Sequence, residues 1–563
     1  MRRLIGALVA ACAAGALVVV PSAIGQDKPP FIMQGSQVEV QILALNDFHG
    51  NLLPPSGSSG RVGTVEAGGA AFLATHVREL EQANANSIVV SAGDLIGASP
   101  LLSALFHDEP TIEAMNQIGL DINAVGNHEF DEGTTELLRM QNGGCHPTDG
   151  CLDGDGFAGA DFQFLAANVV SETTGQTLFA PYTIRNFNGA KVAFVGMTLE
   201  GTPNIVSPSG VAGFDFLDEA DTVNALIPEL VAQDVGAVVV VIHEGGLPTA
   251  LDINGCAGVS GPIVDIVNRL DDRVDLVISG HTHQPYSCVI DDTPVTSAFS
   301  FGRLITDIDM RVDRAEKRVT SISINNRIVT RTVAPDAGIN ALIDRYNLIA
   351  APIANRVIGQ ITADITRTNN AAGESALGDV IADGQLDATD DPGFGDAVVA
   401  FMNPGGIRAD LTFASSPAGE GDGNVTYGEM FTVQPFGNSL VTMTLTGAQI
   451  ERLLEEQFAP CTLGTNRILQ VSVGFSYAWN AAGGTCDKVD PALITINGVV
   501  VDPLASYRVT VNSFLADGGD SFPILVSGTN RLGGEVDTDA FEKYFAANSP
   551  VPPGPQNRIT RVG

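Results

Sequence analysis

The sequence predicts a layered α/β protein with two large domains joined by a helix. Its 563 residues exceed what one hydrophobic core supports, and 44% of them are hydrophobic against 17% charged, as in globular proteins. Short apolar segments alternate with helical segments in the first half, a pattern typical of sheets covered by helices. We place the first domain at residues 37–334, a linker helix at 335–355 and the second domain at 356–549.

The chain begins with the pattern of a secretory signal. A basic start precedes an apolar run at residues 4–20, and small residues follow it. This predicts a signal peptide over residues 1–25 and a mature protein that is secreted, periplasmic or held at the cell surface. Lipid attachment at Cys12 is the less favoured interpretation, because the apolar run continues well past it. No later run has the length of a transmembrane helix.

The formal net charge of −36 argues against nucleic acid or an anionic membrane as a partner, because both attract clustered Lys and Arg. A small anionic substrate would need a local positive charge, which bound divalent metal ions supply. The sequence does not indicate an oligomeric state.

Six cysteines follow the predicted signal peptide, and an even number suits an oxidising compartment. One pair shares a Gly-rich loop, and each other pair falls within one predicted domain, so we favour pairing in chain order over a zinc site. The expected disulfides join Cys145 with Cys151, Cys256 with Cys288, and Cys461 with Cys486.

The elements of the first domain follow in order. The predicted strands are residues 38–46, 87–91, 122–125, 191–197, 237–242 and 274–279. Residues 69–82 carry their apolar side chains on one helical stripe. The segment 145–161 is rich in Gly and Asp but has Phe162 where a calcium-binding loop needs Glu, so we interpret it as a solvated, disulfide-tied insertion.

Polar side chains appear where five of these strands stop. They are Asp47, His49, Asp94, Asn127, His128, His243, His281 and His283. We expect them at the same edge of one sheet, because parallel strands end on a common side. Imidazole, carboxylate and amide groups suit zinc, manganese or iron, and the set is too large for one ion. Two ions about 3.5–4 Å apart would account for it and would favour an in-line phosphoryl displacement.

The linker helix and the second domain carry clear local signals. Asp336 stands at an N-cap position before an apolar stripe, and Pro352 is expected to close the helix. Beyond it we expect a helix at 374–386, a strand at 397–402 and a helix that begins with a capping box at Thr446.

The strand-end blocks resemble the calcineurin-like metallophosphoesterases, and the whole pattern is similar to the secreted 5'-nucleotidases and UDP-sugar hydrolases. The blocks are Asp47-Phe48-His49, Gly93-Asp94, Gly126-Asn127-His128-Glu129, His243 and Gly280-His281-Thr282-His283. The resemblance spans roughly residues 38–545. It implies an α/β/β/α first domain and a C-terminal α/β substrate-binding domain.

The resemblance also implies two divalent metal ions, Zn or Mn, in a shared site. One ion would take Asp47, His49, Asp94 and His283, and the other would take Asp94, Asn127, His243 and His281. His128 would touch the reacting phosphate, and Asp131 would orient it. Relatives often carry Asn or Gln in place of His283, a difference that bears on metal affinity.

In the second domain the resemblance implies a nucleotide site. Asn403 and Arg408 match a phosphate-facing loop, where a guanidinium offers a planar pair of donors. Phe436 and Phe514 match segments that sandwich a base, and Asp520 would accept hydrogen bonds from a ribose.

One family arginine is missing, because Gly373 occupies its place and Arg367 lies several residues upstream. The function we expect is that of a secreted, dinuclear-metal phosphohydrolase releasing phosphate from 5'-nucleotides. A UDP-sugar hydrolase and a 2',3'-cyclic-nucleotide phosphodiesterase with 3'-nucleotidase activity need the same metals and remain alternatives. The non-enzymatic alternative is a nucleotide-binding or adhesion protein on the same scaffold.

Overall fold

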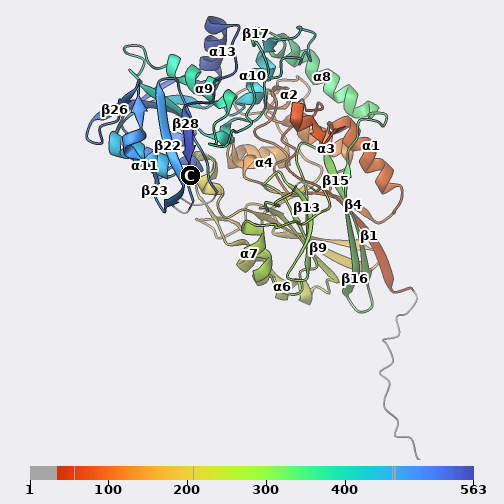
Figure 1. Ribbon diagram of the computed structural model, residues 1–563. Helices are drawn as coiled ribbons and strands as arrows, with labels where there is room; N and C mark the ends of the chain where they lie inside the picture. The colour runs from red at the N-terminus through yellow and green to blue at the C-terminus, as the bar shows by residue number, and fades with distance from the viewer. Residues whose placement is uncertain (1–34, 56, 207, 251, 460, 462–464) are drawn as a thin grey trace, which may run out of the picture. The chain divides into compact units, whose positions relative to one another are not determined.

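The computed structural model describes residues 35–563, except residues 56, 207, 251, 460 and 462–464. Residues 37–563 form one compact unit (Figure 1). The predicted signal peptide at 1–25 lies outside the described residues. In the part of the chain that is described, no helix combines the length and the apolar character needed to cross a membrane.

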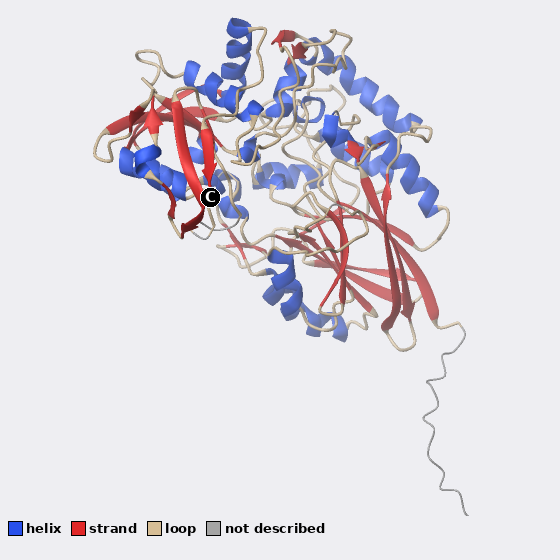
Figure 2. Cartoon of the chain, viewed as in Figure 1, coloured by secondary structure: helices blue, strands red, loops and turns tan. Residues whose placement is uncertain are grey.

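Two six-stranded sheets form the first domain (Figure 2). The first runs β16 (Arg318–Ile328), β15 (Leu304–Asp313), β1 (Gln37–Leu45), β4 (Ser87–Ser91), β5 (Ile122–Ala124) and β6 (Gln163–Leu165). The second runs β13 (Pro285–Ile290), β14 (Thr293–Ala298), β12 (Leu276–Ser279), β11 (Ala237–His243), β9 (Ala190–Thr198) and β8 (Tyr182–Phe187). Strands β1, β4 and β5 are parallel, as are β9, β11 and β12, so each sheet gathers several carboxyl ends on one edge.

An apolar layer lies between the sheets, where Val40 and Ile42 of β1 are buried with Val239 and Val241 of β11. Helices pack on the outer faces. They are α1 (Ala70–Glu81) and α3 (Glu109–Ile118) on the first sheet, and α6 (Glu219–Ala232) and α7 (Pro262–Arg269) on the second. The order α/β/β/α is the one the family resemblance implied.

The expectation that all the polar strand ends lie on one sheet is wrong. Strands β1, β4 and β5 end on the first sheet, whereas β11 and β12 end on the second. A buried apolar run shows that a strand is covered on both faces, but it does not show which sheet the strand joins.

The linker helix α8 (Ala337–Ala354) begins where the sequence predicted, with the Asp336 side chain accepting a hydrogen bond from the Ile339 backbone N–H at 2.9 Å. It continues through Pro352 for two further residues instead of ending there. Its buried face includes Tyr346, whose ring packs edge-on against Phe106 at 4.7 Å.

The disulfide-tied insertion at 145–161 is largely exposed, as predicted, and it also contacts the linker helix. Tyr346 donates a hydrogen bond to Asp153 at 3.1 Å, and Arg345 pairs with Asp155 and, at 2.6 Å, with Glu113 of α3. These contacts join the insertion to α8 and α3.

The second domain contains a sheet of β21 (Gln470–Val471), β18 (Val399–Met402), β26 (Ser506–Asn512), β20 (Ser439–Thr446) and β27 (Thr529–Val536). A second sheet contains β23 (Asp487–Val489), β22 (Phe475–Gly484), β24 (Thr495–Ile496), β25 (Val499–Val500) and β28 (Ile559–Val562). Its helices include α9 (Ala376–Asp387), α10 (Tyr427–Val433), α11 (Gly447–Glu455) and α13 (Asp537–Asn548). The predicted capping box at Thr446 is confirmed at the start of α11. Because β28 pairs with β22, the chain beyond residue 549 also packs in this domain.

Three disulfides join the six cysteines in chain order, which confirms the predicted pairing. They are Cys145 with Cys151, Cys256 with Cys288, and Cys461 with Cys486.

Candidate active site

Each predicted metal ligand lies at or just beyond the carboxyl end of a parallel strand. The first sheet supplies Asp47, His49, Asp94 and Asn127, and the second supplies His243, His281 and His283. Five of the seven have a left-handed backbone, with φ between 47° and 68°. Only a few per cent of non-glycine residues adopt it, and such strain persists where the surrounding structure imposes a functional geometry.

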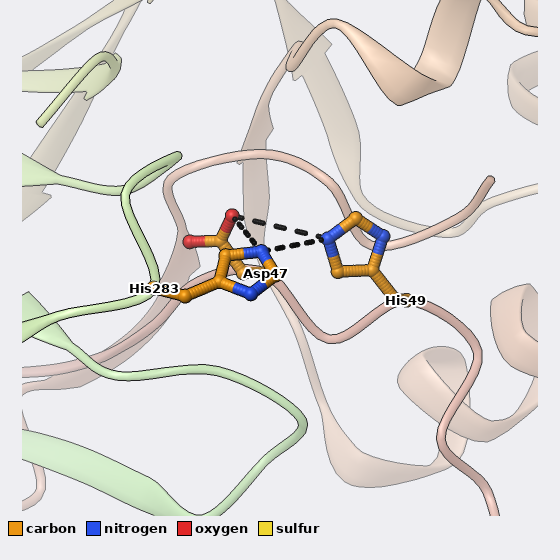
Figure 3. Close-up of side chains that lie close together, drawn as sticks. All are labelled: Asp47, His49 and His283. Atoms are coloured by element: carbon orange, nitrogen blue, oxygen red, sulfur yellow. Dashed lines mark hydrogen bonds and ion pairs between the residues drawn. The ribbon is translucent and has the colours of Figure 1, made fainter. Parts of the chain in front are cut away.

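Asp47, His49 and His283 form the first cluster, and their side chains point toward one another (Figure 3). The Nε2 atoms of His49 and His283 lie 3.1 Å apart, and Asp47 Oδ1 lies 3.2 Å from the latter. His49 Nδ1 donates to the Gly97 carbonyl at 2.9 Å, which turns Nε2 toward the cluster. Two nitrogens so oriented suit a cation that both can bind.

Asp94, His243 and His281 form the second cluster. His243 Nδ1 donates to the Ala92 carbonyl at 2.7 Å, so that Nε2 faces Asp94 Oδ2 at 3.0 Å. The same Asp94 oxygen lies 3.6 Å from His49 Nε2 in the first cluster. Asp94 therefore stands between the two clusters, where a bridging carboxylate would have to be.

The histidines of each cluster form what we call the converging pairs, His49 with His283 and His243 with His281. Their ring centroids lie 5.1 Å and 5.2 Å apart, with interplanar angles of 56° and 70°. Rings in this arrangement can direct their lone pairs at a common point, as ligands of one ion must.

One buried donor atom supports metal binding. Among the described residues, Asn127 Oδ1 has no hydrogen-bond partner. Leaving a buried polar atom unpaired costs about 1–3 kcal/mol, so such atoms call for another partner. Imidazole, carboxylate and amide donors together suit zinc, manganese or iron. The residues present therefore fit divalent cations.

The two histidines of the second cluster differ strongly in pKa. Burial, reinforced by the charge of His243, lowers the pKa of His281 to about 3. Burial also opposes a charge on His243, but the Asp94 carboxylate outweighs it and raises the His243 pKa to about 10. His281 is therefore neutral at physiological pH and keeps a lone pair available.

His128 lies beside the clusters and pairs with Asp131. Its Nδ1 lies 2.8 Å from Asp131 Oδ2, and its backbone N–H donates to Asp94 Oδ1 at 2.9 Å. Burial alone would lower the His128 pKa, but the carboxylates of Asp131 and Asp94 raise it above the ordinary value. The ring of Phe436 stacks on His128, with centroids 5.7 Å apart. The imidazole is thus held from both the carboxylate and the aromatic side.

Glu129 connects the loops that follow β4 and β5. Its carboxylate accepts hydrogen bonds from the backbone N–H groups of Asp94, Leu95 and Gly126 at 2.7–3.0 Å. Gly126 is required for close approach, because a Cβ there would lie 2.2 Å from Asp94 Oδ1. The motif therefore keeps β4 and β5 in register at the site.

One cavity of about 230 Å³ extends from this centre into the second domain. From the predicted sites it is lined by Asn127, His128, Asp131, His281, Asn403, Arg408, Phe436, Phe514 and Asp520. All five predicted substrate-binding residues thus meet the predicted catalytic pair in one space. The remaining predicted ligands are not among the described residues that line it.

Asn403 makes contacts that the motif did not predict. Its Nδ2 donates to Asp520 Oδ2 at 2.7 Å, and its Oδ1 accepts from Asn512 at 3.0 Å. Its side chain therefore holds Asp520 and faces the phosphate end less directly than expected.

Three cavity residues were missed by the sequence analysis: Ile205, Val206 and Arg467. No motif marks them, because they lie on loops that only the fold brings together. Arg367, the candidate substitute for the family arginine, donates to Ser59 Oγ at 3.2 Å and is not among the described residues that line the cavity.

A third group of potential ligands has a different geometry. His107 and His146, here called the stacked pair, lie face to face with centroids 3.8 Å apart and an interplanar angle of 14°. Both nitrogens of His107 are hydrogen-bonded, one to Glu132 at 2.8 Å and the other to Asp149 at 3.0 Å. Both ring nitrogens of His107 therefore already have carboxylate partners.

Comparison with known proteins gives two matching family models. Residues 40–285 match "Calcineurin-like phosphoesterase", and residues 357–527 match "5'-nucleotidase, C-terminal domain". The chain is 32% identical over 535 residues to the endonuclease YhcR of Bacillus subtilis, covering 93% of this chain and 41% of that protein. It is 32% identical over 539 residues to the cell wall protein Lmo0130 of Listeria monocytogenes, covering 90% of this chain and 67% of that protein.

Among solved structures, the fold is similar to that of a 5'-nucleotidase precursor from Thermus thermophilus. The two share a TM-score of 0.76 and 26% sequence identity, over 93% of this chain and 100% of that chain. The match covers both domains and agrees with the layered architecture described above. The chain therefore belongs to the calcineurin-like phosphoesterases with a C-terminal 5'-nucleotidase domain, a family of metal-dependent phosphoester hydrolases.

Proposed function

We propose that this protein is a secreted hydrolase that holds two divalent metal ions, Zn or Mn, and releases phosphate from nucleoside 5'-monophosphates. The observation that carries the proposal is one cavity in which Asn127 and His281 of the predicted metal site, with His128 beside them, meet Arg408, Phe436 and Phe514. A nucleotide would fit this cavity with its phosphate at the charged end and its planar base between the phenylalanines.

Seven residues would hold the metal ions. Asp47, His49 and His283 would bind one, Asn127, His243 and His281 would bind the other, and Asp94 would serve both. The ions would supply Lewis-acid activation and would neutralise charge on the phosphoryl oxygens. The carbonyl groups that accept from His49 and His243 would fix the ring orientations.

His128 would act on the reacting phosphate. Asp131 accepts from its Nδ1, so Nε2 is left to donate toward the cavity. A raised pKa keeps this imidazole protonated at higher pH, which suits a donor to the leaving oxygen or to developing charge. Asp131 would set the orientation of the ring.

The second domain would select the substrate. Arg408 lines the cavity, and its guanidinium lies over the Phe436 ring at 5.9 Å, at the end where a phosphate would reach it. Phe436 and Phe514 would stack on the base, and Asp520 would accept from the ribose.

Secretion is supported by the sequence of the chain start and by three disulfides, which persist in oxidising compartments. We place the domain boundaries at residues 37–334, 335–355 and 356–549, with the segment after 549 packed on the second domain.

Phosphate release from AMP tests the proposal. The protein is assayed as prepared, after chelation with EDTA, and after re-addition of Zn or Mn. We expect activity that is lost on chelation and restored by metal. Parallel assays with UDP-glucose and 2',3'-cyclic AMP distinguish the alternative substrates. Absence of metal-dependent phosphate release from AMP would refute the 5'-nucleotidase proposal.

A further inference from the structure

Asp520 is held from two sides inside the cavity. Asn403 Nδ2 donates to its Oδ2 at 2.7 Å, and Arg467 Nε lies 3.6 Å from its Oδ1. All three side chains line the same space as Phe436 and Phe514. Among the residues that the structure describes, each carboxylate oxygen of Asp520 thus has one partner.

Both partners are themselves positioned. Asn512 donates to Asn403 Oδ1 at 3.0 Å, and the Arg467 backbone N–H donates to the Gln457 carbonyl at 2.8 Å. Asp520 has a left-handed backbone with φ 54°, a conformation that is uncommon outside glycine. The structure therefore accepts local strain in order to place this carboxylate.

The Asp520 carboxylate can accept further hydrogen bonds from a ligand on both of its oxygens. An ionised carboxylate offers about four lone-pair positions on two oxygens. The two protein partners leave capacity on each oxygen, and the Asp520 side chain is 12% exposed, toward the cavity. Two adjacent O–H donors would match it, as the 2',3'-diol of a ribose provides.

The charge of Arg467 matters as well. An uncompensated carboxylate would repel the phosphate of a nucleotide, in a chain whose formal net charge is already −36. The Arg467 guanidinium, paired with Asp520 at 3.6 Å, offsets that repulsion and attracts the carboxylate to its own side. Arg467 thus reduces the repulsion between Asp520 and an incoming phosphate and helps to keep the Asp520 carboxylate in place.

We propose that Arg467, together with Asn403, is a positioning residue that holds Asp520 so that the cavity selects ribonucleosides over 2'-deoxyribonucleosides. This inference rests on the proposed nucleotide-hydrolysing function and extends it to the sugar. A deoxyribose leaves one prepared acceptor without a donor, and a site built to bind a hydroxyl rejects the analogue that lacks it.

The test measures binding of adenosine and 2'-deoxyadenosine to the full-length, metal-loaded protein by calorimetry. In the wild type we expect adenosine to bind roughly tenfold or more tightly, as a hydrogen bond to a charged acceptor allows. In Arg467→Ala the ratio should fall toward one, and Arg467→Lys should restore part of it. Arg452→Ala is the matched control, because Arg452 pairs with Glu456 at 3.0 Å on α11, away from the cavity lining.

Kinetics with AMP and 2'-deoxy-AMP give a second measurement. Arg467→Ala should raise KM for AMP by about tenfold and leave kcat within about threefold, because Arg467 does not touch the reacting phosphate. A general folding defect would instead lower kcat and the melting temperature, and would leave the ratio between the two sugars unchanged.

Three results would overturn the inference. They are a wild type that binds both nucleosides equally, a wild type that binds neither, and an Arg467→Ala variant that keeps the wild-type ratio within twofold. If AMP is hydrolysed while the nucleosides bind equally, only this inference fails. If the nucleosides are discriminated but no nucleotide is hydrolysed, the proposed function fails and the sugar selectivity stands.

Discussion

The converging pairs and the stacked pair use the same residue types in opposite ways. The converging pairs have ring centroids 5.1 Å and 5.2 Å apart, whereas the stacked pair lies at 3.8 Å and is nearly parallel. In the stacked pair both His107 nitrogens are hydrogen-bonded to carboxylates, whereas in the first converging pair the Nε2 atoms of His49 and His283 face each other at 3.1 Å. The converging pairs have the geometry that metal ligands need, whereas the stacked pair holds a proton between carboxylates.

Ring direction, and not backbone strain, distinguishes the two groups. His107 has a left-handed φ of 52°, in the same range as His49 and His283. Lone pairs of imidazole lie in the ring plane, so two face-to-face rings direct them side by side and cannot share an ion. A cluster of histidines and carboxylates is therefore a metal site only when its donor atoms converge.

The largest expected effect comes from removing the carboxylate between the converging pairs. Asp94→Asn should lower kcat/KM for AMP on the order of a thousandfold, because metal ions contribute several kcal/mol of transition-state stabilisation. Phosphate release measures it. Asp149→Asn, which removes a carboxylate from the stacked pair, should stay within about threefold of the wild type. Comparable losses of kcat/KM in both variants would show that the stacked pair matters to activity as much as the converging pairs do.

Replacing His128 tests whether the residue beside the converging pairs acts on the substrate and not on the metal. His128→Gln should lower kcat for AMP by about 10²–10⁴-fold, the usual contribution of a positioned acid or base. Metal content, measured by mass spectrometry, should be unchanged. If the bound metal falls together with the activity, His128 is a ligand and its assigned role is wrong. His146→Gln serves as the control histidine.

Metal addition should stabilise the folded protein through the converging pairs and not through the stacked pair. At a metal concentration of 100 times Kd, the chelated protein should gain about 2.7 kcal/mol in free energy of unfolding on re-addition of Zn or Mn. His243→Ala should lose most of this gain, and His107→Gln should keep it. Melting temperature followed by calorimetry measures the difference. A gain that disappears in His107→Gln would show that the stacked pair binds metal after all.

The smallest expected effect is the pH dependence of stability that comes from the proton on His107. The hydrogen bond with Glu132, opposed by burial and aided by the charge of Glu132 and the hydrogen bond with Asp149, raises the His107 pKa to about 9. The folded state therefore binds a proton more tightly than the unfolded state, whose ordinary value is 6.5. The resulting stability is fully present below pH 6.5 and is lost as pH rises through about 9.

The expected contribution is only about 1 kcal/mol, because both carboxylate partners are nearly half exposed and solvent screens them. Urea unfolding at pH 6 and pH 9.5 should show this decrease in the wild type and a flatter profile in His107→Gln. A wild type whose stability does not fall over this range beyond the change seen in the variant would contradict the assignment.

Much of the fold and of the candidate site was accessible from local signals. The abrupt ends of β1, β4, β5, β11 and β12 predicted where the polar side chains would gather, because an apolar run that stops in a motif marks the carboxyl end of a buried strand. The N-cap at Asp336 and the capping box at Thr446 were equally local, since each depends on hydrogen bonds within four residues.

Other features depended on contacts between distant segments. Pro352 did not end the linker helix, because packing of the apolar face of α8 outweighs the loss of one backbone hydrogen bond. Asn403 matched a phosphate loop in sequence, yet its amide is engaged by Asp520 and Asn512, more than a hundred residues away.

By itself the sequence determined which side chains end the strands and which family motifs are present, because these properties reside in short segments. Only the tertiary structure decided that the predicted metal ligands come from two sheets, that one histidine group converges while the other stacks, and that Arg467 instead of Arg367 enters the cavity. The physical reason is that hydrophobic periodicity specifies burial, whereas the direction of a side chain and the identity of its distant partners follow from packing of the whole chain.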